Sequence, residues 1–441
     1  MIEKYLVKKI TEPVDWKVTV PGSKSMTNRA LLMAVLSAGT VRVEGVLFSD
    51  DSRHFLACLV ALGFTVEIEE EKKCVTVTGC GGRIPRGEAV IDVGSAGTAA
   101  RFLAAMLGFS DGCYEIRCSA QMKRRPMAEL FDLLSGAGAK ITFLEEEGHL
   151  PVRITGCRYA RADKTAGETP RELSLDITKS TQFLSALLLI APMVPEGMKI
   201  HITSEKTDGS YIRITRKMMQ EFGVSVAFDG RDYEVPCRSS YRKETYTVEP
   251  DMSAACYFYA AAAVTGGRAL VRHVHMDNTQ GDLRFLEVLE HMGCTADDTP
   301  EGVLVTGPAD GALRGITVNM NDFSDQALTL AAIAPFADAP VRIEGIGHIR
   351  GQECDRIHAI QTNLTALGIR CEEEETAATI YPGSPHGGSV ETYDDHRVAM
   401  AFSLVGLRTD GIVIENPACC RKTFENYFTV LSELTGKKTE A

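Results

Sequence analysis

The sequence predicts an α/β protein of two similar lobes, each built from three αβαββ units. Two kinds of segment alternate along the chain. The first is a helix that ends on glycine and is followed by a strand, a turn and a second strand; the second is a helix rich in small residues followed by one strand. A chain of 441 residues is also too long for one ordinary core, which favours two domains of roughly 200 residues each.

The first kind of segment contains the helix-ending glycine. A glycine after a helix adopts the left-handed conformation that lets the chain reverse into a strand. Five copies and a truncated sixth lie at 59–79, 133–156, 218–236, 288–307, 363–382 and 428–438. Their glycines are Gly63, Gly138, Gly223, Gly293, Gly368 and Gly436.

The second kind of segment contains a helix that is apolar nearly all round, so it should be buried. The helices between these copies, such as 52–63, are amphipathic and should lie against sheets. The six copies lie at 23–46, 95–118, 179–203, 251–274, 322–345 and 394–416. Three units then fall on either side of a boundary near Glu249-Pro250.

Each buried helix starts with a polar cluster. The first, "PGSKS", has a capping serine but surrounds it with Lys24, Ser25 and Arg29. Cations are mildly unfavourable at a helix N-terminus, so a bound anion is the simplest reason for them. The other clusters are Ser95 to Arg101 (with Gly97), Ser180-Thr181-Gln182, Asp251 to Ser253, Asp322 to Asp325, and Asp394-Asp395-His396-Arg397.

Three buried helices side by side in each lobe would present their N-termini on one face. That face would gather unpaired backbone N–H groups and positive helix ends. Two such faces joined by a hinge form a cleft suited to anions, and we expect the active site there. Ser49-Asp50-Asp51, before the helix at 52–63, is better explained as capping alone.

Further charged residues fit this cleft, although each has a simpler explanation. Lys123, Arg124 and Arg125 precede a helix expected to begin at Pro126, but basic runs are usually solvated. Glu353 and Arg356 are three apart on an expected helix, which alone would indicate a surface ion pair. Arg421 and Lys422 lie in a loop before the last helix. His396 fits an N-terminal capping role as well as a catalytic one.

Composition and missing motifs exclude several classes of protein. The net charge of -12 argues against nucleic-acid binding. The 13 cysteines are scattered without metal spacing, as expected of buried thiols in a reducing cytosol. There is no phosphate-binding P-loop, dinucleotide fingerprint, zinc-protease or serine-hydrolase motif. What remains is a metal-independent site with many cations and a few carboxylates, Asp325 and Glu353, suited to multiply anionic substrates and proton transfer.

The N-terminal residues do not form a signal peptide, because charges interrupt the apolar run. No uninterrupted apolar stretch reaches membrane-spanning length. We therefore expect a cytoplasmic protein, and in the absence of an obvious interface helix, a monomer.

Motifs along nearly the whole chain resemble the EPSP synthase family, the 3-phosphoshikimate 1-carboxyvinyltransferases. They include "PGSKSMTNRALL", "GSAGTAARFLAA", "STQFLSALLL", "SDQALTLAAIAPFA", "ECDRIHAI", "YDDHRVAMAFSL" and "RKTFENYF". The resemblance implies two inside-out α/β lobes, with residues 1–20 joining 250–441 in one lobe and 21–249 forming the other. It implies transfer of the enolpyruvyl group of phosphoenolpyruvate to the 5-hydroxyl of shikimate 3-phosphate in aromatic amino-acid biosynthesis, with release of phosphate and without metal or cofactor.

The resemblance also implies roles for individual residues. Asp325 and Glu353 match the catalytic carboxylates, and Lys24 or His396 would donate or relay a proton. The shikimate 3-phosphate set is Lys24, Ser25, Arg29, Ser180, Thr181, Gln182, Tyr211, Asp325 and Gln352. The phosphoenolpyruvate set is Lys24, Gly97, Arg125, Gln182, Arg356, Arg397 and Lys422.

The sequence departs from the family pattern at five positions. Gln352 stands where the family has a lysine, which removes one cation from the phosphoshikimate side. The other departures are Ser95, Gln121, Asp208 and His348. Two alternatives remain open: the related UDP-N-acetylglucosamine enolpyruvyl transferase, which uses a loop cysteine (here Cys419 or Cys420), and a non-catalytic six-repeat binding protein.

Overall fold

The computed structural model describes residues 3–157, 170–308 and 312–436. The chain divides into two compact units, one from Gly22 to Glu249 and one that combines the residues up to Pro21 with those from Pro250 onward. Each unit has its own hydrophobic core. Within the described residues, no helix is both long enough and apolar enough to cross a membrane.

Three buried helices form the centre of each unit, as the apolar segments predicted. In each unit the three helices all contact one another, and almost all of their residues are buried. In the 22–249 unit they are α1 (Lys24–Leu36), α3 (Gly97–Gly108) and α6 (Thr181–Ile190). In the other unit they are α8 (Met252–Thr265), α10 (Ala327–Ile333) and α12 (His396–Arg408).

A second set of helices has one buried and one exposed face, as predicted for the amphipathic segments. Each is followed by a glycine with positive φ: Gly63, Gly138, Gly223, Gly293, Gly368 and Gly436, with φ between 65° and 104°. The expected left-handed helix ends are therefore confirmed. The helices are α2 (Asp50–Ala61), α5 (Ala128–Gly136), α7 (Ser210–Glu221), α9 (Phe285–His291), α11 (Arg356–Ala366) and α13 (Tyr427–Leu434).

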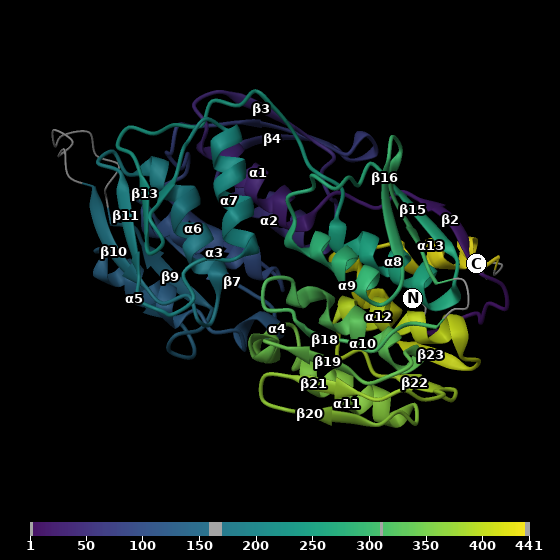
Figure 1. Ribbon diagram of the computed structural model, residues 1–441. Helices are drawn as coiled ribbons and strands as arrows, with labels where there is room; N and C mark the ends of the chain where they lie inside the picture. The colour runs from purple at the N-terminus through teal and green to yellow at the C-terminus, as the bar shows by residue number, and fades with distance from the viewer. Residues whose placement is uncertain (1–2, 158–169, 309–311, 437–441) are drawn as a thin grey trace. The chain divides into compact units, whose positions relative to one another are not determined.

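Small mixed sheets lie outside the central helices of each unit (Figure 1). In each four-stranded sheet two strands pair in parallel, and an antiparallel hairpin completes the order. The first sheet of the 22–249 unit has the strand order β14 (Thr245–Thr247), β3 (Thr40–Glu44), β5 (Cys74–Thr78) and β4 (Thr65–Glu69). The second has the order β6 (Glu88–Asp92), β7 (Cys113–Arg117), β9 (Val152–Thr155) and β8 (Lys140–Phe143). The third has the order β10 (Arg171–Leu175), β11 (Met198–Ile202), β13 (Asp232–Val235) and β12 (Ala227–Phe228).

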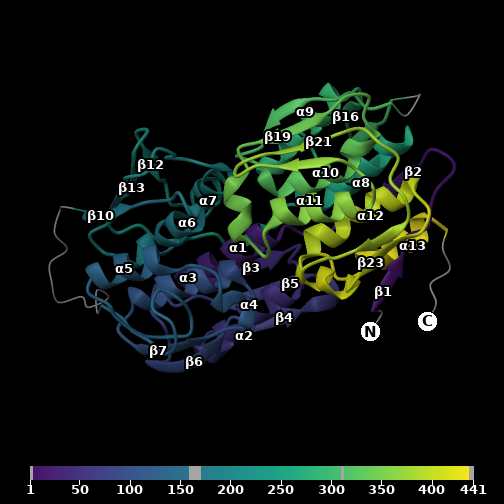
Figure 2. The same ribbon diagram turned by 90° about the horizontal axis from the view of Figure 1, so that it is seen from below.

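The other unit repeats this order twice and ends with a three-stranded sheet. Its four-stranded sheets are β2 (Asp15–Val18), β15 (Arg268–Arg272), β17 (Gly302–Thr306) and β16 (Thr295–Thr299); and β18 (Thr317–Asn319), β19 (Val341–Glu344), β21 (Ala378–Ile380) and β20 (Cys371–Glu373). The third is β1 (Lys4–Leu6), β23 (Ile412–Glu415) and β22 (Gly388–Val390). Here β1 runs antiparallel to β23 in place of the missing hairpin (Figure 2).

The structure adds one strand to each predicted unit, so the repeat is βαβαββ. The additional strands are short and precede the buried helices, for example β18 with three residues and β6 with five. In the first repeat the additional strand comes from the end of the unit, because β14 pairs with β3. The strand before α1, β2, pairs instead with β15. Within the described residues the sixth repeat has no terminal hairpin, and residues 437–438 of its predicted segment lie outside them.

Candidate functional site

The start of α1 leaves its backbone without the expected serine cap. Ser23 occupies the N-cap position but makes no side-chain capping bond, and the first turn contains no acidic residue. The expectation of a capping serine is therefore wrong. Lys24, the first helical residue, forms an ion pair with Asp51 on α2, with 3.3 Å between Nζ and Oδ2. Their side chains are only 16% and 2% exposed.

Asp51 consequently does more than stabilise the start of α2. Ser49 caps that helix through a reciprocal bond with Ser52, as predicted. The carboxylate of Asp51, two residues after Ser49, forms an ion pair with the Lys24 ammonium group. The interpretation of this segment as capping alone missed that ion pair.

Arg29 is a buried cation whose hydrogen bonds within the described residues all go to neutral groups. Its guanidinium donates to Thr215 Oγ1 at 2.8 Å, to the Ser25 carbonyl at 2.9 Å and to the Tyr211 carbonyl at 3.3 Å. It also lies 5.3 Å from the ring centre of Phe102. Desolvation lowers its pKa to about 10. Burying a charge without an opposite charge is costly, so this arginine is suited to bind an anion.

Gly97 lies against two guanidinium groups at the start of α3. A Cβ atom at this position would come within 2.5 Å of Arg125 Nη1 and 2.7 Å of Arg101 Nη1. Arg101 Nη1 donates to the Gly97 carbonyl at 3.0 Å. Arg125 follows the short helix α4 (Ala120–Lys123), and α5 begins at Ala128 rather than at Pro126 as predicted. The sequence thus brings two arginines to the N-terminus of α3.

The start of α6 contains the predicted polar triplet. Ser180 is the N-cap and its side chain accepts from the Gln182 backbone N–H at 3.2 Å. The Gln182 Oε1 atom is buried and has no hydrogen-bond partner within the described residues. Within the described residues, the side chains of Thr181 and Gln182 make no hydrogen bond to the other predicted site residues. Arg29 links α1 to α6 and α7, since it also donates to Ser185 at 3.4 Å.

In the other unit, Arg356 occupies the centre of a buried ionic cluster. Its guanidinium pairs with Asp395 at 2.8 Å, Glu353 at 2.9 Å and Asp325 at 3.0 Å. It also donates to Gln352 Oε1. Burial alone would lower the pKa of Arg356, but the carboxylates of Asp395, Glu353 and Asp325 raise it above its ordinary value.

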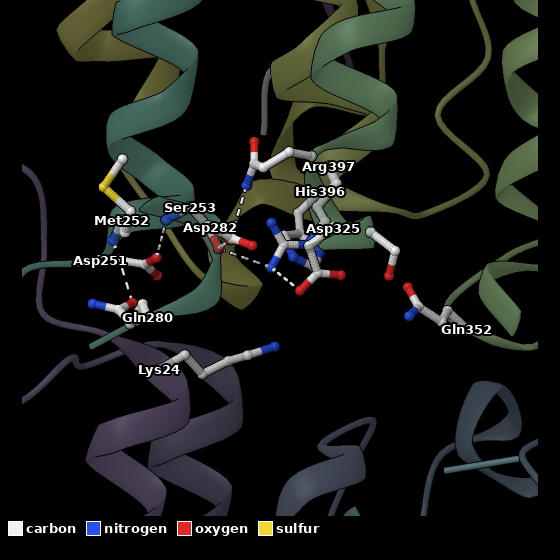
Figure 3. A network of polar contacts seen from close by, with 12 residues as sticks. Lys24, Asp251, Met252, Ser253, Gln280, Asp282, Asp325, Gln352, His396 and Arg397 are labelled. Carbon is white, nitrogen blue, oxygen red and sulfur yellow. Dashed lines mark hydrogen bonds and ion pairs between the residues drawn. The ribbon is translucent and has the colours of Figure 1, made fainter. Parts of the chain in front are cut away.

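Two further cations complete this cluster. Arg397 Nη2 lies 2.9 Å from Asp325 Oδ2 and 3.4 Å from Ser253 Oγ. Lys422 Nζ lies 3.1 Å from Glu353 Oε1. Figure 3 shows the Arg397 guanidinium beside the Asp325 carboxylate, with Ser253 and Asp282 next to each other. Asp325 and Glu353 therefore each bridge two cations.

Two interpretations of this region are wrong. Glu353 and Arg356 do not share a helix, because α11 begins at Arg356 with Asp355 as its N-cap. Their ion pair is buried rather than on the surface, with side chains 9% and 2% exposed. His396 is not the capping residue of α12. Asp395 is, through the Arg397 backbone N–H, and His396 Nδ1 lies 3.6 Å from Asp395 Oδ1.

Several residues of this cluster were not predicted as site residues. Asp395 was seen only as part of a polar helix start, and Ser253 likewise. Gln326, in the short 3₁₀ helix η4 (Ser324–Gln326), and Asp282, in η3 (Gly281–Arg284), were not predicted, because their significance comes from partners that are distant in sequence. Among the described residues, no group of three or more histidines, cysteines or acidic residues could hold a metal ion.

Three of the five departures from the family pattern have identified local partners. His348 Nε2 lies 2.8 Å from Ser324 Oγ, next to Asp325 in the chain. Asp208 accepts from Arg213 at 2.9 Å and from the Tyr233 hydroxyl at 3.2 Å. Ser95 and Gln121 are half-buried. Gln352, in the position of the missing lysine, contacts Arg356 instead of adding a cation.

Comparison with known proteins identifies the family. Residues 8–431 match the family model for EPSP synthase (3-phosphoshikimate 1-carboxyvinyltransferase). A protein named 3-phosphoshikimate 1-carboxyvinyltransferase from Trichormus variabilis is 41% identical to this chain, over 97% of this chain and 98% of that protein. A protein of the same name from Nostoc punctiforme is also 41% identical, over 95% of this chain and 96% of that protein. An EPSP synthase structure from Acinetobacter baumannii superimposes with a TM-score of 0.78 at 25% identity, covering 98% of this chain and 97% of that one. The enolpyruvyl transferase NikO from Streptomyces tendae has the same fold, with a TM-score of 0.72 at 17% identity. The chain thus belongs to the EPSP synthase family.

Proposed function

We propose that the protein transfers the enolpyruvyl group of phosphoenolpyruvate to the 5-hydroxyl of shikimate 3-phosphate, with release of phosphate. Family membership supports this, and one observation of the site carries it: the carboxylates of Asp325 and Glu353, whose side chains are 13% and 9% exposed, each bridge two cations. Cations bind the anionic substrates, and carboxylates held beside them can take or return protons.

Residues of both units belong to both predicted substrate sets. In the 22–249 unit, Arg29 binds the 3-phosphate, with Lys24, Ser25, Ser180, Thr181, Gln182 and Tyr211 completing the phosphoshikimate set. Arg125 beside Gly97, and Gln182, contribute to binding phosphoenolpyruvate. In the other unit, Arg356, Arg397 and Lys422 bind phosphoenolpyruvate, and Asp325 and Gln352 contact the phosphoshikimate.

The reaction requires two proton transfers at carbon and one at oxygen. Protonation of the alkene carbon of phosphoenolpyruvate gives cationic character to the adjacent carbon, and Glu353 with Lys24 serves this step. Asp325 takes the proton of the 5-hydroxyl as its oxygen bonds to that carbon. Loss of the added proton then re-forms the double bond as the bond to phosphate breaks. His396, 3.6 Å from Asp395, relays protons.

The assignment of Asp325 is tested by the Asp325→Ala variant. Removing the base should abolish turnover, because each such proton-transfer group contributes about 10²–10⁴-fold. Binding of shikimate 3-phosphate, measured by titration calorimetry, should persist because its phosphate contacts remain. A variant with full activity would contradict this role.

The overall function is tested by a phosphate-release assay with both substrates and with each omitted in turn. Release should require both. The UDP-N-acetylglucosamine enolpyruvyl transferase and the non-catalytic repeat protein are not favoured by the comparisons. Cys420 is buried, and burial raises its pKa well above the ordinary value of a thiol. Because no thiol takes part in the proposed reaction, thiol-blocking reagents should leave turnover intact. We also propose, from the sequence, that the protein is a cytoplasmic monomer.

A further inference from the structure

Asp282 is a buried carboxylate with no assigned role in the proposed reaction. It lies in η3, and a single oxygen, Oδ2, accepts both of its side-chain hydrogen bonds. One donor is the hydroxyl of Ser253, the second residue of α8. The other is Gln326 Nε2 at 2.9 Å, the residue after Asp325 in η4. Asp282 thus connects the start of α8 with the segment that holds Asp325.

Both of these contacts lead to Asp325. Because Ser253 gives its only hydroxyl proton to Asp282, it presents a lone pair to Arg397 Nη2, 3.4 Å away. The same Nη2 group donates to Asp325 at 2.9 Å. The Gln326 amide is fixed at its other end too, because its Oε1 accepts from Thr329 Oγ1 at 2.9 Å. Two chains of hydrogen bonds therefore run from Asp282 to the immediate neighbours of Asp325.

We infer that Asp282 is a positioning residue that holds Arg397 and Asp325 in their reactive arrangement through Ser253 and Gln326. The inference rests on the proposed function, because Asp325 is its base. A hydrogen-bonded second layer of this kind matters since displacement of a catalytic group by about 1 Å can cost about 10²-fold in rate. Asp282 itself touches neither substrate in this scheme.

The charges around Asp282 suit this role. Asp325 from η4 and Arg397 from α12 are close enough to shift its pKa in opposite directions, and the Cys256 thiol of α8 donates to its backbone carbonyl at 3.7 Å. Desolvation, together with the charge of Asp325, raises the pKa of Asp282 to about 6. Above that pH the carboxylate can only accept hydrogen bonds, so both Ser253 and Gln326 must donate to it.

Two substitutions of similar volume separate hydrogen bonding from packing. In Asp282→Asn, the amide oxygen can take the place of Oδ2 and accept both bonds. In Asp282→Leu, nothing accepts them. We expect Asp282→Leu to lower kcat by roughly 10–100-fold and to raise the KM for phosphoenolpyruvate, which Arg397 binds in this scheme. Asp282→Asn should recover most of the lost kcat. Ser253→Ala breaks one of the two chains, so it should lower kcat by no more than Asp282→Leu does. Adding it to Asp282→Leu should lower kcat little further, because that chain is already broken.

The control is Asn363→Ala, which removes another buried side chain of this unit that bonds only to backbone groups in the described structure, those of Ala359 and Glu391. It should lower the melting temperature without lowering kcat. If Asp282→Leu does not fold, Ser253→Ala decides the same question at a smaller residue. Parent-like kcat in the folded Asp282→Leu variant, or equal losses in Asp282→Leu and Asp282→Asn, would overturn the inference alone. Failure of the parent protein to release phosphate would remove the proposed function and the inference together.

Discussion

Arg356 and Asp395 form an ion pair that is buried on both sides. Arg356 Nε lies 2.8 Å from Asp395 Oδ2, and the two side chains are 2% and 0% exposed. Asp395 is also the N-cap of α12, and Arg356 is the first residue of α11. One carboxylate therefore fixes the beginnings of two helices, and through Arg356 it is connected to Asp325 and Glu353.

Removing the cation of this cluster should destabilise the protein strongly. Arg356→Gln leaves the carboxylates of Asp325, Glu353 and Asp395 without their shared partner, and breaking a buried pair in this way costs about 3–5 kcal/mol. Trp16, the single tryptophan of the chain, is buried in the same core. Its fluorescence during urea unfolding therefore reports the stability of this unit.

A matched control for Arg356 is Arg370→Gln. Arg370 pairs with Glu372 on the surface, with side chains 68% and 48% exposed, and exposed pairs contribute little to stability. Its unfolding curve should coincide with that of the parent. Equal urea midpoints for Arg356→Gln and the parent would show that the buried cluster does not stabilise this unit.

Arg29 should contribute to anion binding rather than to stability. Its guanidinium is desolvated and has only neutral partners among the described residues. Arg29→Met puts an unbranched apolar side chain in place of the arginine and so removes this buried charge. We expect an unchanged or higher melting temperature, and shikimate 3-phosphate affinity weakened by about 10–100-fold, since a hydrogen bond to a charged group contributes roughly 1.5–3 kcal/mol. Differential scanning fluorimetry and calorimetric titration measure the two effects.

Arg216→Met is the control for Arg29 in the same unit. Arg216 lies over Phe228 and Tyr233, at 5.4 Å and 5.9 Å from the ring centres, so its replacement loses packing but no predicted ligand. The variant should bind shikimate 3-phosphate as the parent does. If both variants bound equally well, Arg29 would not be an anion-binding residue.

A methyl group at Gly97 should displace arginines without disturbing the helix. The added Cβ would collide with the mobile ends of Arg125 and Arg101, while the backbone of α3 needs no left-handed conformation there. Gly97→Ala should keep or slightly raise stability, because alanine favours a helix over glycine by about 1 kcal/mol. The KM for phosphoenolpyruvate should rise several-fold in steady-state assays. In Gly136→Ala on α5, where the new Cβ meets nothing within 4 Å, this KM should not change.

The repeat pattern could be predicted because each buried helix and each helix-ending glycine leaves a local signal. Gly223, for example, has φ of 91° after α7, and only glycine adopts that conformation without strain. The strands before the buried helices leave no such signal. A strand of three residues such as β22 is too short to display alternation, and the pairing of β2 with β15 spans some 250 residues of sequence.

Lys24, Arg29 and Arg397 could be predicted from polar helix starts, whereas Arg125, Arg356 and Lys422 were assigned through the family resemblance. The partners that hold these cations could not be predicted. Arg356 is three residues from Glu353 in sequence, whereas Asp325 and Asp395 come from other repeats. Burial decides the character of such a pair, and sequence spacing cannot distinguish an exposed pair from a buried one. Asp282 was missed for the same reason, because its significance comes from Ser253 and Gln326, which lie 29 and 44 residues away.

The ionisation of Asp282 should make the stability of its unit depend on pH. Its pKa is raised from 3.8 to about 6, so between these values the folded state binds more protons than the unfolded state. Stability then falls as the pH rises through this range.

Asp282→Asn removes that dependence. Relative to the parent, the variant should gain on the order of 1–3 kcal/mol between pH 4 and pH 7.5, since one pKa unit corresponds to about 1.4 kcal/mol. Urea unfolding followed by Trp16 fluorescence gives the free energy of unfolding of each protein at both pH values. The contributions of the other titrating groups cancel when the parent value is subtracted from the variant value. An identical difference between variant and parent at the two pH values would mean that the Asp282 carboxylate has an ordinary pKa in the folded protein.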